Sequence, residues 1–129
     1  MAPFPLDHVG IVTPSISGAA RSYELLTGAE CSQIETLPQQ GVSVAFVGDI
    51  ELIEPLGDES PILRFLERQG PGLHHLAYRV PSIPEALSRL RDEGFEPIDE
   101  VPRRGARGHL VAFLHPRSSG GVLWELVQG

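Results

Sequence analysis

Two histidines and two glutamates stand at matching places in the two halves of the chain. His8 and His75 are 67 positions apart, and Glu51 and Glu125 are 74 positions apart. Each lies in an apolar run typical of a strand, in which alternate side chains share one face. A buried carboxylate needs a partner, because an isolated buried charge is very costly. Two imidazoles and two carboxylates would satisfy one divalent cation, so these four residues are candidate metal ligands.

An internal repeat supports this pairing. The segment from His8 to Ile16 resembles the segment from His75 to Ile83, with His, Pro, Ser and Ile in register. The same offset relates Val44–Val47 to Val111–Leu114. The offset rises from 67 to 74 between these segments and the pair Glu51 and Glu125, which fits a longer turn before Glu125 in the second half. If the two halves pair about a pseudo-twofold axis, the four candidate ligands converge.

Each half of the chain is predicted to fold as one strand, one helix and three further strands. The expected strands are residues 6–13, 29–37, 41–47 and 50–54 in the first half, and 74–80, 96–101, 109–114 and 122–127 in the second. Ser15 or Ser17 caps a helix that ends before Gly28, and the capping box Ser82–Glu85 opens a helix that ends at Gly94. The predicted fold class is α+β, with two βαβββ modules paired into a metal-holding half-barrel.

These modules form a single predicted domain over residues 5–128. The repeats cover about residues 5–56 and 73–128, and a short helix at about residues 60–69 joins them. The helix begins at Ser60-Pro61 and stops at Gly70.

Composition excludes several functional classes. The chain has 129 residues, ten basic residues that are all Arg, and a net charge of −7. A net negative charge disfavours nucleic-acid binding, and the absence of Lys excludes Schiff-base chemistry. One cysteine excludes an internal disulfide framework and a Cys-rich zinc site. No long apolar run or signal peptide is evident, so we expect a cytoplasmic protein that does not bind membranes.

One stretch of this acidic chain is basic. No Asp or Glu occurs between Glu100 and Glu125, where Arg103, Arg104, Arg107 and Arg117 lie. This distribution suggests a small anionic ligand. The thiolate-free ligand set suits Co, Mn, Fe, Ni or Zn, and open positions on such an ion would let it polarise a carbonyl and stabilise an enolate.

Other reactive side chains are given structural roles. His74 alternates away from His75 and is expected at the surface or behind the ligands. His115 precedes Pro116 in a turn, where a structural role is expected. Cys31 has no positively charged neighbour to lower its pKa and is expected to be inert.

The sequence resembles the vicinal oxygen chelate (glyoxalase/bleomycin-resistance/dioxygenase) superfamily, and within it the methylmalonyl-CoA epimerases, from about Leu6 to Gln128. The resemblance rests on the following stretches: Asp7–Ile11, Gly41–Phe46, Ile50–Leu56, Asp58–Ile62, Leu73–His75, Gly105–Gly108, Phe113–Arg117 and Gly120–Leu126. The His and Glu positions indicate the superfamily, whereas the segments Ile53–Gly57 and Phe113–Pro116 indicate the epimerases.

The resemblance implies a metal-dependent epimerase that interconverts (R)- and (S)-methylmalonyl-CoA through an enolate. It implies that His8, His75 and Glu125 bind the metal, with cobalt favoured, and that Glu125 is also catalytic. Glu51 occupies the fourth ligand position, where relatives often have Gln. Arg104, Arg107 and Arg117 would meet the CoA phosphates, and a homodimer is expected.

The second proton carrier stays open, because some relatives place an acid on the strand that begins at Gly41, and here that strand has Val44 and no acid. Two other functions use the same fold. One is a glyoxalase-type lactoylglutathione lyase, which shares the ligand pattern. The other is a metal-free, drug-sequestering binding protein, whose members usually lack the converging His and Glu residues.

Overall fold

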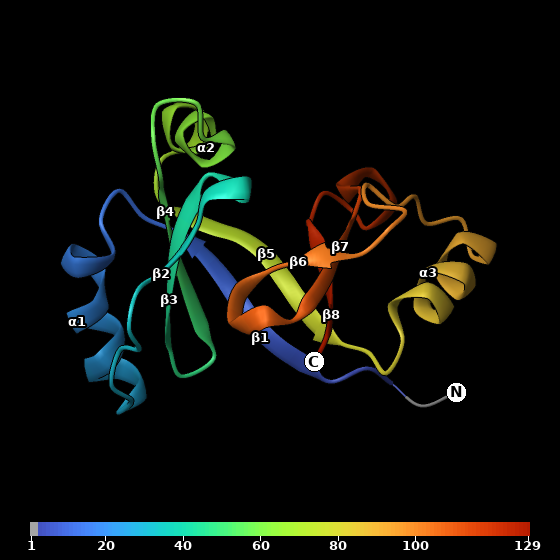
Figure 1. Ribbon diagram of the computed structural model, residues 1–129, viewed down its shortest axis with the longest axis horizontal. Coiled ribbons are helices and arrows are strands. Elements are labelled where there is room, and N and C mark those ends of the chain that lie inside the picture. Colours follow the sequence, from blue (N-terminus) through green and yellow to red (C-terminus); the bar gives the residue numbers. More distant parts are fainter. Residues whose placement is uncertain (1–2) are drawn as a thin grey trace. The chain divides into compact units, whose positions relative to one another are not determined.

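The computed structural model describes residues 3–129 (Figure 1). The strands are β1 (Leu6–Val12), β2 (Glu35–Leu37), β3 (Val42–Val47), β4 (Ile50–Pro55), β5 (Gly72–Arg79), β6 (Arg103–Arg104), β7 (Leu110–Leu114) and β8 (Trp124–Gln128). The α-helices are α1 (Ile16–Thr27), α2 (Pro61–Gln69) and α3 (Ile83–Asp92). Short 3-10 turns cover Pro38–Gln40, Ala106–Gly108 and Pro116–Ser118. Hydrogen bonding orders the strands β2-β3-β4-β1-β5-β8-β7-β6.

The chain divides into two compact units whose boundaries fall inside β1 and β5. One unit is Val9–His74, and the other joins the N-terminal residues up to His8 with His75–Gly129. The first boundary therefore lies directly after His8 and the second directly before His75. Both predicted histidine ligands belong to the same unit.

The unit Val9–His74 contains a ladder in which β1 runs parallel to β4, and β3 is antiparallel to both β4 and β2. One face of this ladder packs against α1. Its buried core consists of Ile16, Ala45, Val47 and Leu52, with partly buried residues including Ile11 and Tyr23 around it. The strand residues of this core alternate along their strands, as expected for a sheet with one face toward a helix.

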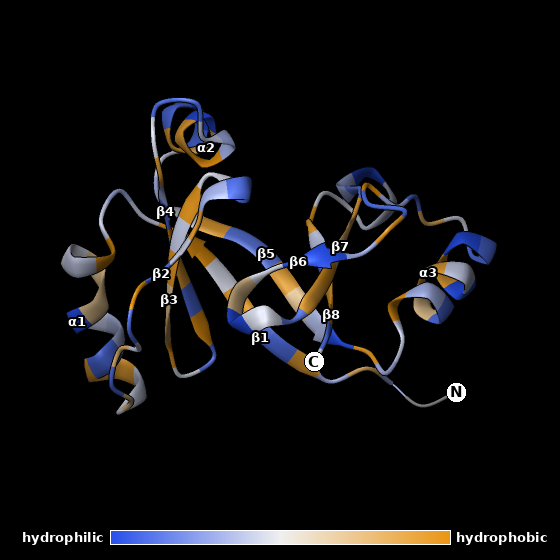
Figure 2. Ribbon diagram, viewed as in Figure 1, coloured by the Kyte–Doolittle hydropathy of each residue, from blue (hydrophilic) through white to orange (hydrophobic). Residues whose placement is uncertain are grey.

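The other unit repeats this arrangement. Strand β5 runs parallel to β8, and β7 is antiparallel to both β8 and β6. Helix α3 covers one face, where Ile83 and Leu87 pack with Leu114 and Leu126. Ala77, Val111 and Val127 form a separate buried cluster. Helices α2 and α3 both carry hydrophobic and hydrophilic residues, typical of amphipathic surface helices (Figure 2).

The helix ends agree with the predicted capping signals. The Ser15 hydroxyl accepts a hydrogen bond from the Gly18 N–H, and Gly28 ends α1 in a left-handed conformation at φ 74°. A Cβ at that φ is strained, which is why glycine suits the position. The Ser60 and Ser82 side chains cap α2 and α3 in the same way as Ser15 caps α1.

Two predicted strands differ from the structure. Residues 29–37 contribute only the three-residue β2 and an isolated bridge between Cys31 and Val47. Residues 96–101 form no ladder strand beyond a bridge from Pro97 to Leu114, and the outermost strand is β6 instead. The backbone N–H groups of Ile98 and Asp99 donate to the Phe113 carbonyl, whereas the Phe113 N–H donates to the Asp99 carboxylate at 2.9 Å, so the backbone pairing is irregular there. Within residues 3–129, no helix has the length and apolar character needed to cross a membrane.

Truncation of a core leucine tests the role of the α3 interface in holding β7 and β8. Leu114 is fully buried, at 0% exposure. We expect Leu114→Ala to lower the free energy of unfolding by about 2–5 kcal/mol, because it removes apolar contacts and leaves a cavity. Leu25→Ala is the matched control, because Leu25 is 67% exposed on α1. Urea denaturation measures both, and equal losses would contradict the assigned core.

Candidate metal centre

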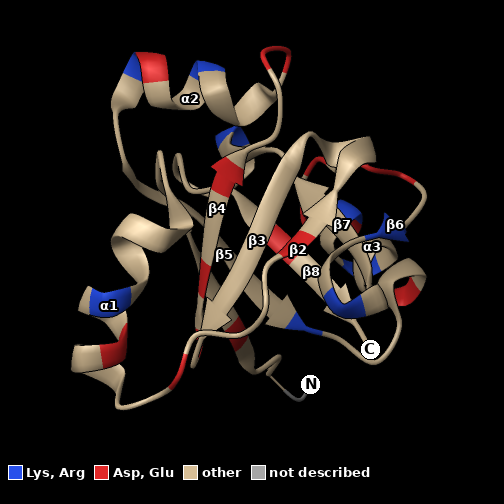
Figure 3. Ribbon diagram, turned by 60° about the vertical axis from the view of Figure 1, so that its left-hand side comes forward, with Lys and Arg blue, Asp and Glu red and all other residues tan. Residues whose placement is uncertain are grey.

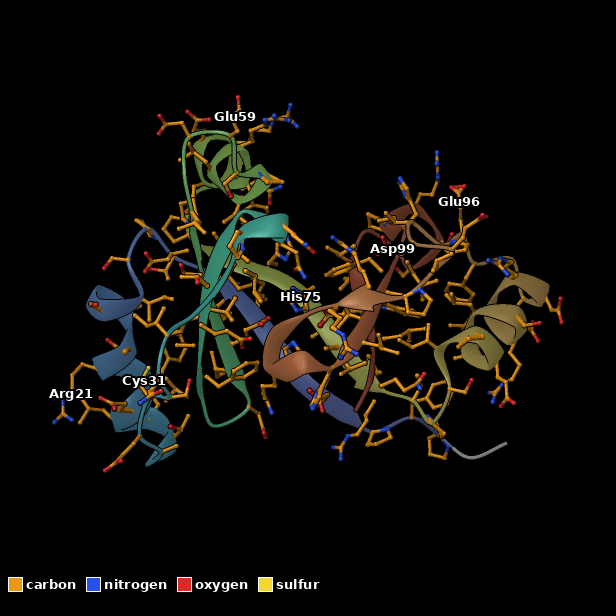
Figure 4. All side chains as sticks on the ribbon, in the orientation of Figure 1. Arg21, Cys31, Glu59, His75, Glu96 and Asp99 are labelled. Carbon is orange, nitrogen blue, oxygen red and sulfur yellow. The ribbon has the colours of Figure 1, made fainter. Side chains whose placement is uncertain are left out.

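Three ligand-type side chains converge within the unit that holds both histidines. Nε2 of His8 lies 3.2 Å from Nε2 of His75 and 3.1 Å from Oε1 of Glu125. Nε2 of His75 lies 3.4 Å from the same carboxylate oxygen. All three residues are buried, at 4–7% exposure, and Oε1 of Glu125 is shielded from solvent. Figure 4 labels His75 on β5.

This geometry fits a single cation. Donor atoms about 2.0–2.1 Å from one zinc-type ion lie about 2.9–3.4 Å apart at octahedral to tetrahedral angles. The three observed separations, 3.1–3.4 Å, fall within that range. Two imidazole nitrogens and one carboxylate oxygen form a donor set suited to Zn, Co, Ni, Fe or Mn. The residues present therefore fit a divalent metal ion.

Strand register explains why these side chains meet. Glu125 on β8 pairs with Phe113 on β7 and with Ala77 on β5, two residues after His75. Paired residues and residues two apart on a strand share a face, so Glu125 and His75 point to the same side. Trp124 and Leu126 point to the other side, where they pack with the α3 core. The alternation expected from the sequence is confirmed at this position.

Glu51 has the equivalent register in the unit Val9–His74. It pairs with Phe46 on β3 and with Gly10 on β1, two residues after His8 along the same strand. The repeat therefore extends to backbone pairing, with Phe46 matching Phe113 and Gly10 matching Ala77. Glu51 is buried at 6% exposure. Glu51, like His8 and His75, is therefore a buried residue of a type that binds metals.

Two neighbours of this cluster were missed by the sequence reasoning. Asp7 receives a 2.8 Å contact from Nδ1 of His8, and its other oxygen lies 3.3 Å from Nε of Arg79. The Phe113 ring packs edge-on against His75, at 5.6 Å between ring centroids. The only sequence signals were the adjacency of Asp7 and His8 and the repeat of Phe46 at Phe113, and neither predicts a contact.

The three predicted substrate arginines lie in the basic stretch that begins with β6 and ends before β8. All are exposed, and Nη1 of Arg104 donates to the Gly108 carbonyl at 2.8 Å. Arg107 adopts a left-handed conformation, φ 59°, in the 3-10 turn after β6. Arg117 forms a two-pronged ion pair with Glu96, at 2.7 and 3.2 Å. Strand β6 is basic along its length (Figure 3).

The other reactive residues have the structural roles expected of them. The His74 ring packs against Phe65 of α2, at 5.2 Å between centroids. Nδ1 of His115 accepts from the Arg117 N–H and caps the last 3-10 turn. Burial raises the pKa of the Cys31 thiol, and the nearby Glu24 carboxylate raises it further, so little reactive thiolate forms at neutral pH.

Comparisons with known proteins identify the family of this chain. The model of the glyoxalase/bleomycin resistance protein/dioxygenase superfamily matches residues 7–113. The uncharacterized protein YqjC of Bacillus subtilis is 44% identical over 127 residues, which cover 95% of this chain and 91% of that protein. The mitochondrial methylmalonyl-CoA epimerase of Homo sapiens is 41% identical over 128 residues, which cover 95% and 73%.

Solved structures give the same result. A hypothetical protein from Bacillus halodurans has a TM-score of 0.94 and 42% identity, covering 99% of this chain and 96% of that one. A methylmalonyl-CoA epimerase variant from Streptomyces coelicolor, in complex with 2-nitronate-propionyl-CoA, has a TM-score of 0.90 and 29% identity, with coverages of 99% and 96%. The predicted resemblance and the predicted glyoxalase-like fold class are both confirmed.

Loss of one imidazole tests whether the cluster binds metal. We expect the protein to bind one equivalent of Co²⁺ and His75→Ala to weaken that affinity at least about 10-fold, because a donor is removed. His115→Ala is the control, since His115 lies in the same unit but caps a turn. Calorimetric titration of the metal-free proteins measures both. Equal Co²⁺ affinity in wild type and His75→Ala would contradict the site.

Proposed function

The chain belongs to the glyoxalase/bleomycin resistance protein/dioxygenase superfamily, and from this premise we propose that it is a metal-dependent epimerase of methylmalonyl-CoA. It would interconvert the (R) and (S) forms of the thioester. The observation that carries the proposal is the convergence of His8, His75 and Glu125 in a chain 41% identical to the human mitochondrial enzyme.

The ion would be held by His8, Glu51, His75 and Glu125. Three of these supply the converging atoms described above, and Glu51 occupies the register equivalent to that of Glu125. When bound, a divalent ion supplies Lewis acidity that stabilises the negative charge of the enolate. A second carboxylate in the set would lower that Lewis acidity relative to a neutral amide, because it adds negative charge beside the ion. Cobalt is the metal we favour, on the family resemblance.

Glu125 is the residue to which we assign proton transfer. The reaction breaks the bond between the α-carbon and its hydrogen, and the electron pair moves toward the thioester oxygen. The carboxylate of Glu125 accepts or returns that proton on one face of the planar carbon. Its burial keeps water away from the reacting atoms. Strand β3 carries no acidic residue, so the group that acts on the opposite face comes from another element.

The exposed arginines of the basic stretch are proposed to bind the phosphates of CoA. Arg104 lies in β6, Arg107 lies in the 3-10 turn that follows it, and Arg117 lies in the 3-10 turn before β8. Guanidinium groups bind phosphates with paired, charge-assisted hydrogen bonds. Arg117 would exchange its Glu96 partner for a phosphate oxygen. We also propose that the protein forms a homodimer, as the family resemblance implies.

Removal of the Glu125 charge tests the assigned chemistry. Glu125→Gln keeps the size of the side chain but cannot act as a base, so exchange of the α-proton of methylmalonyl-CoA should fall at least about 100-fold. Proton NMR in deuterated water measures this exchange directly. Glu85→Gln is the control, because it makes the same change at an exposed position on α3.

The same samples separate the proposed function from a lyase of this fold. The wild-type protein should exchange the α-proton of methylmalonyl-CoA and leave the glutathione hemithioacetal of methylglyoxal unchanged. Turnover of the hemithioacetal without exchange would assign a lactoylglutathione lyase instead. Undiminished exchange in Glu125→Gln would refute the role of that carboxylate.

A further inference from the structure

A carboxylate lies behind His8, on the side of the ring away from the candidate metal ligands. Oδ2 of Asp7 is 2.8 Å from Nδ1 of His8, the ring nitrogen that faces away from His75 and Glu125. Oδ1 of Asp7 lies 3.3 Å from Nε of Arg79. The Asp7 side chain is 13% exposed, so this contact is largely shielded from water. At the repeat position, 67 residues on, the chain has His74 in place of an acid.

We propose that Asp7 is a positioning residue that holds His8 in the tautomer able to bind a metal ion. The inference rests on the proposed metal site, because it assigns Nε2 of His8 as a ligand. It adds a function for a residue that touches neither the ion nor the substrate.

The hydrogen-bond chemistry fixes the direction of the effect. A neutral imidazole carries one N–H, and an ionised carboxylate can only accept. The 2.8 Å contact therefore places the proton on Nδ1 of His8. Nε2 then presents its lone pair toward His75 and Glu125, which is the orientation that a metal ligand requires. Carboxylate partners of metal-binding histidines fix both the tautomer and the ring orientation in this way.

Arg79 restrains the carboxylate in turn. Nε of Arg79 contacts Oδ1 of Asp7, and His8 contacts Oδ2, so each carboxylate oxygen has a partner that fixes its orientation. The Arg79 side chain is 59% exposed, and an exposed ion pair contributes little to stability. Its contribution is therefore to the direction of the Asp7 carboxylate. The backbone supports the same contact, because the Arg79 N–H donates to the Pro5 carbonyl at 2.9 Å.

The experiment compares Asp7→Ala and Asp7→Asn with wild type and with Asp92→Asn. Asp92 ends α3 at an exposed position in the same unit, so its variant makes the same charge change away from His8. The first readout is the dissociation constant for Co²⁺. We expect Asp7→Ala to weaken binding about 10–100-fold and Asp92→Asn to leave it within about 2-fold. Asp7→Asn should weaken it less than Asp7→Ala, because the amide oxygen can still accept from Nδ1.

The second readout is the tautomer of His8 in the metal-free protein, measured from its ring ¹⁵N shifts. Wild type and Asp92→Asn should show protonated Nδ1 and unprotonated Nε2. Asp7→Ala should show a mixture or the opposite tautomer. A role limited to folding would not move this signal in a folded variant, and Asp7→Asn preserves the side-chain size if Asp7→Ala does not fold.

An unchanged tautomer in Asp7→Ala, or Co²⁺ binding as tight as in wild type in both Asp7 variants, would overturn the proposal. The outcome is separable from the proposed function. A wild-type protein that binds Co²⁺ but does not exchange the α-proton of methylmalonyl-CoA refutes the epimerase and leaves Asp7 in its role. A protein that binds no Co²⁺ refutes the metal site, and the ring shifts still decide whether Asp7 sets the tautomer.

Discussion

The buried carboxylate of Glu125 beside two imidazoles is the interaction on which this structure depends. A carboxylate at 7% exposure is costly unless positive charge or hydrogen-bond donors surround it. Nε2 of His75, 3.4 Å from Oε1 of Glu125, can supply part of that compensation as a donor, and a divalent ion would supply more. Such a site would be a poor choice for stability alone, because apolar residues of similar size often stabilise a core equally well. The cluster is better understood as a site built for chemistry.

The fold positions these groups through strand pairing. In one unit Glu51 pairs with Gly10, two residues after His8, and in the other Glu125 pairs with Ala77, two residues after His75. Each glutamate also pairs with a phenylalanine on the neighbouring antiparallel strand. A shift of one residue in either ladder would turn the glutamate toward the helix-covered face. The cores under α1 and α3 oppose that shift, because it would expose Leu52 or Leu126. Packing on one face therefore secures the ligands on the other.

Much of this could be predicted from the sequence, because it depends on periodicity. The repeat relating His8 to His75, the serine caps and the alternation around Glu125 are local patterns, and the structure bears them out. The resemblance to a known superfamily is confirmed over residues 7–113. The pairing of Gly10 with Glu51 and of Ala77 with Glu125 shows that the repeat also holds in the backbone register.

The features that were missed depend on contacts between side chains. Nothing in the sequence indicates that Asp7 reaches Nδ1 of the adjacent His8, because neighbours on a strand usually face opposite ways. Residues 96–101 contain apolar residues typical of a strand, yet the Phe113 N–H donates to the Asp99 side chain instead of to a backbone carbonyl of this segment. The ion pair of Arg117 with Glu96 likewise joins residues that are 21 positions apart.

The most direct test of the account is a crystal structure of the protein grown with Co²⁺, with anomalous diffraction recorded at the cobalt edge. The account predicts one strong peak about 2.1 Å from Nε2 of His8, Nε2 of His75 and a carboxylate oxygen of Glu125. A cobalt ion bound elsewhere, with these three side chains turned apart, would contradict it.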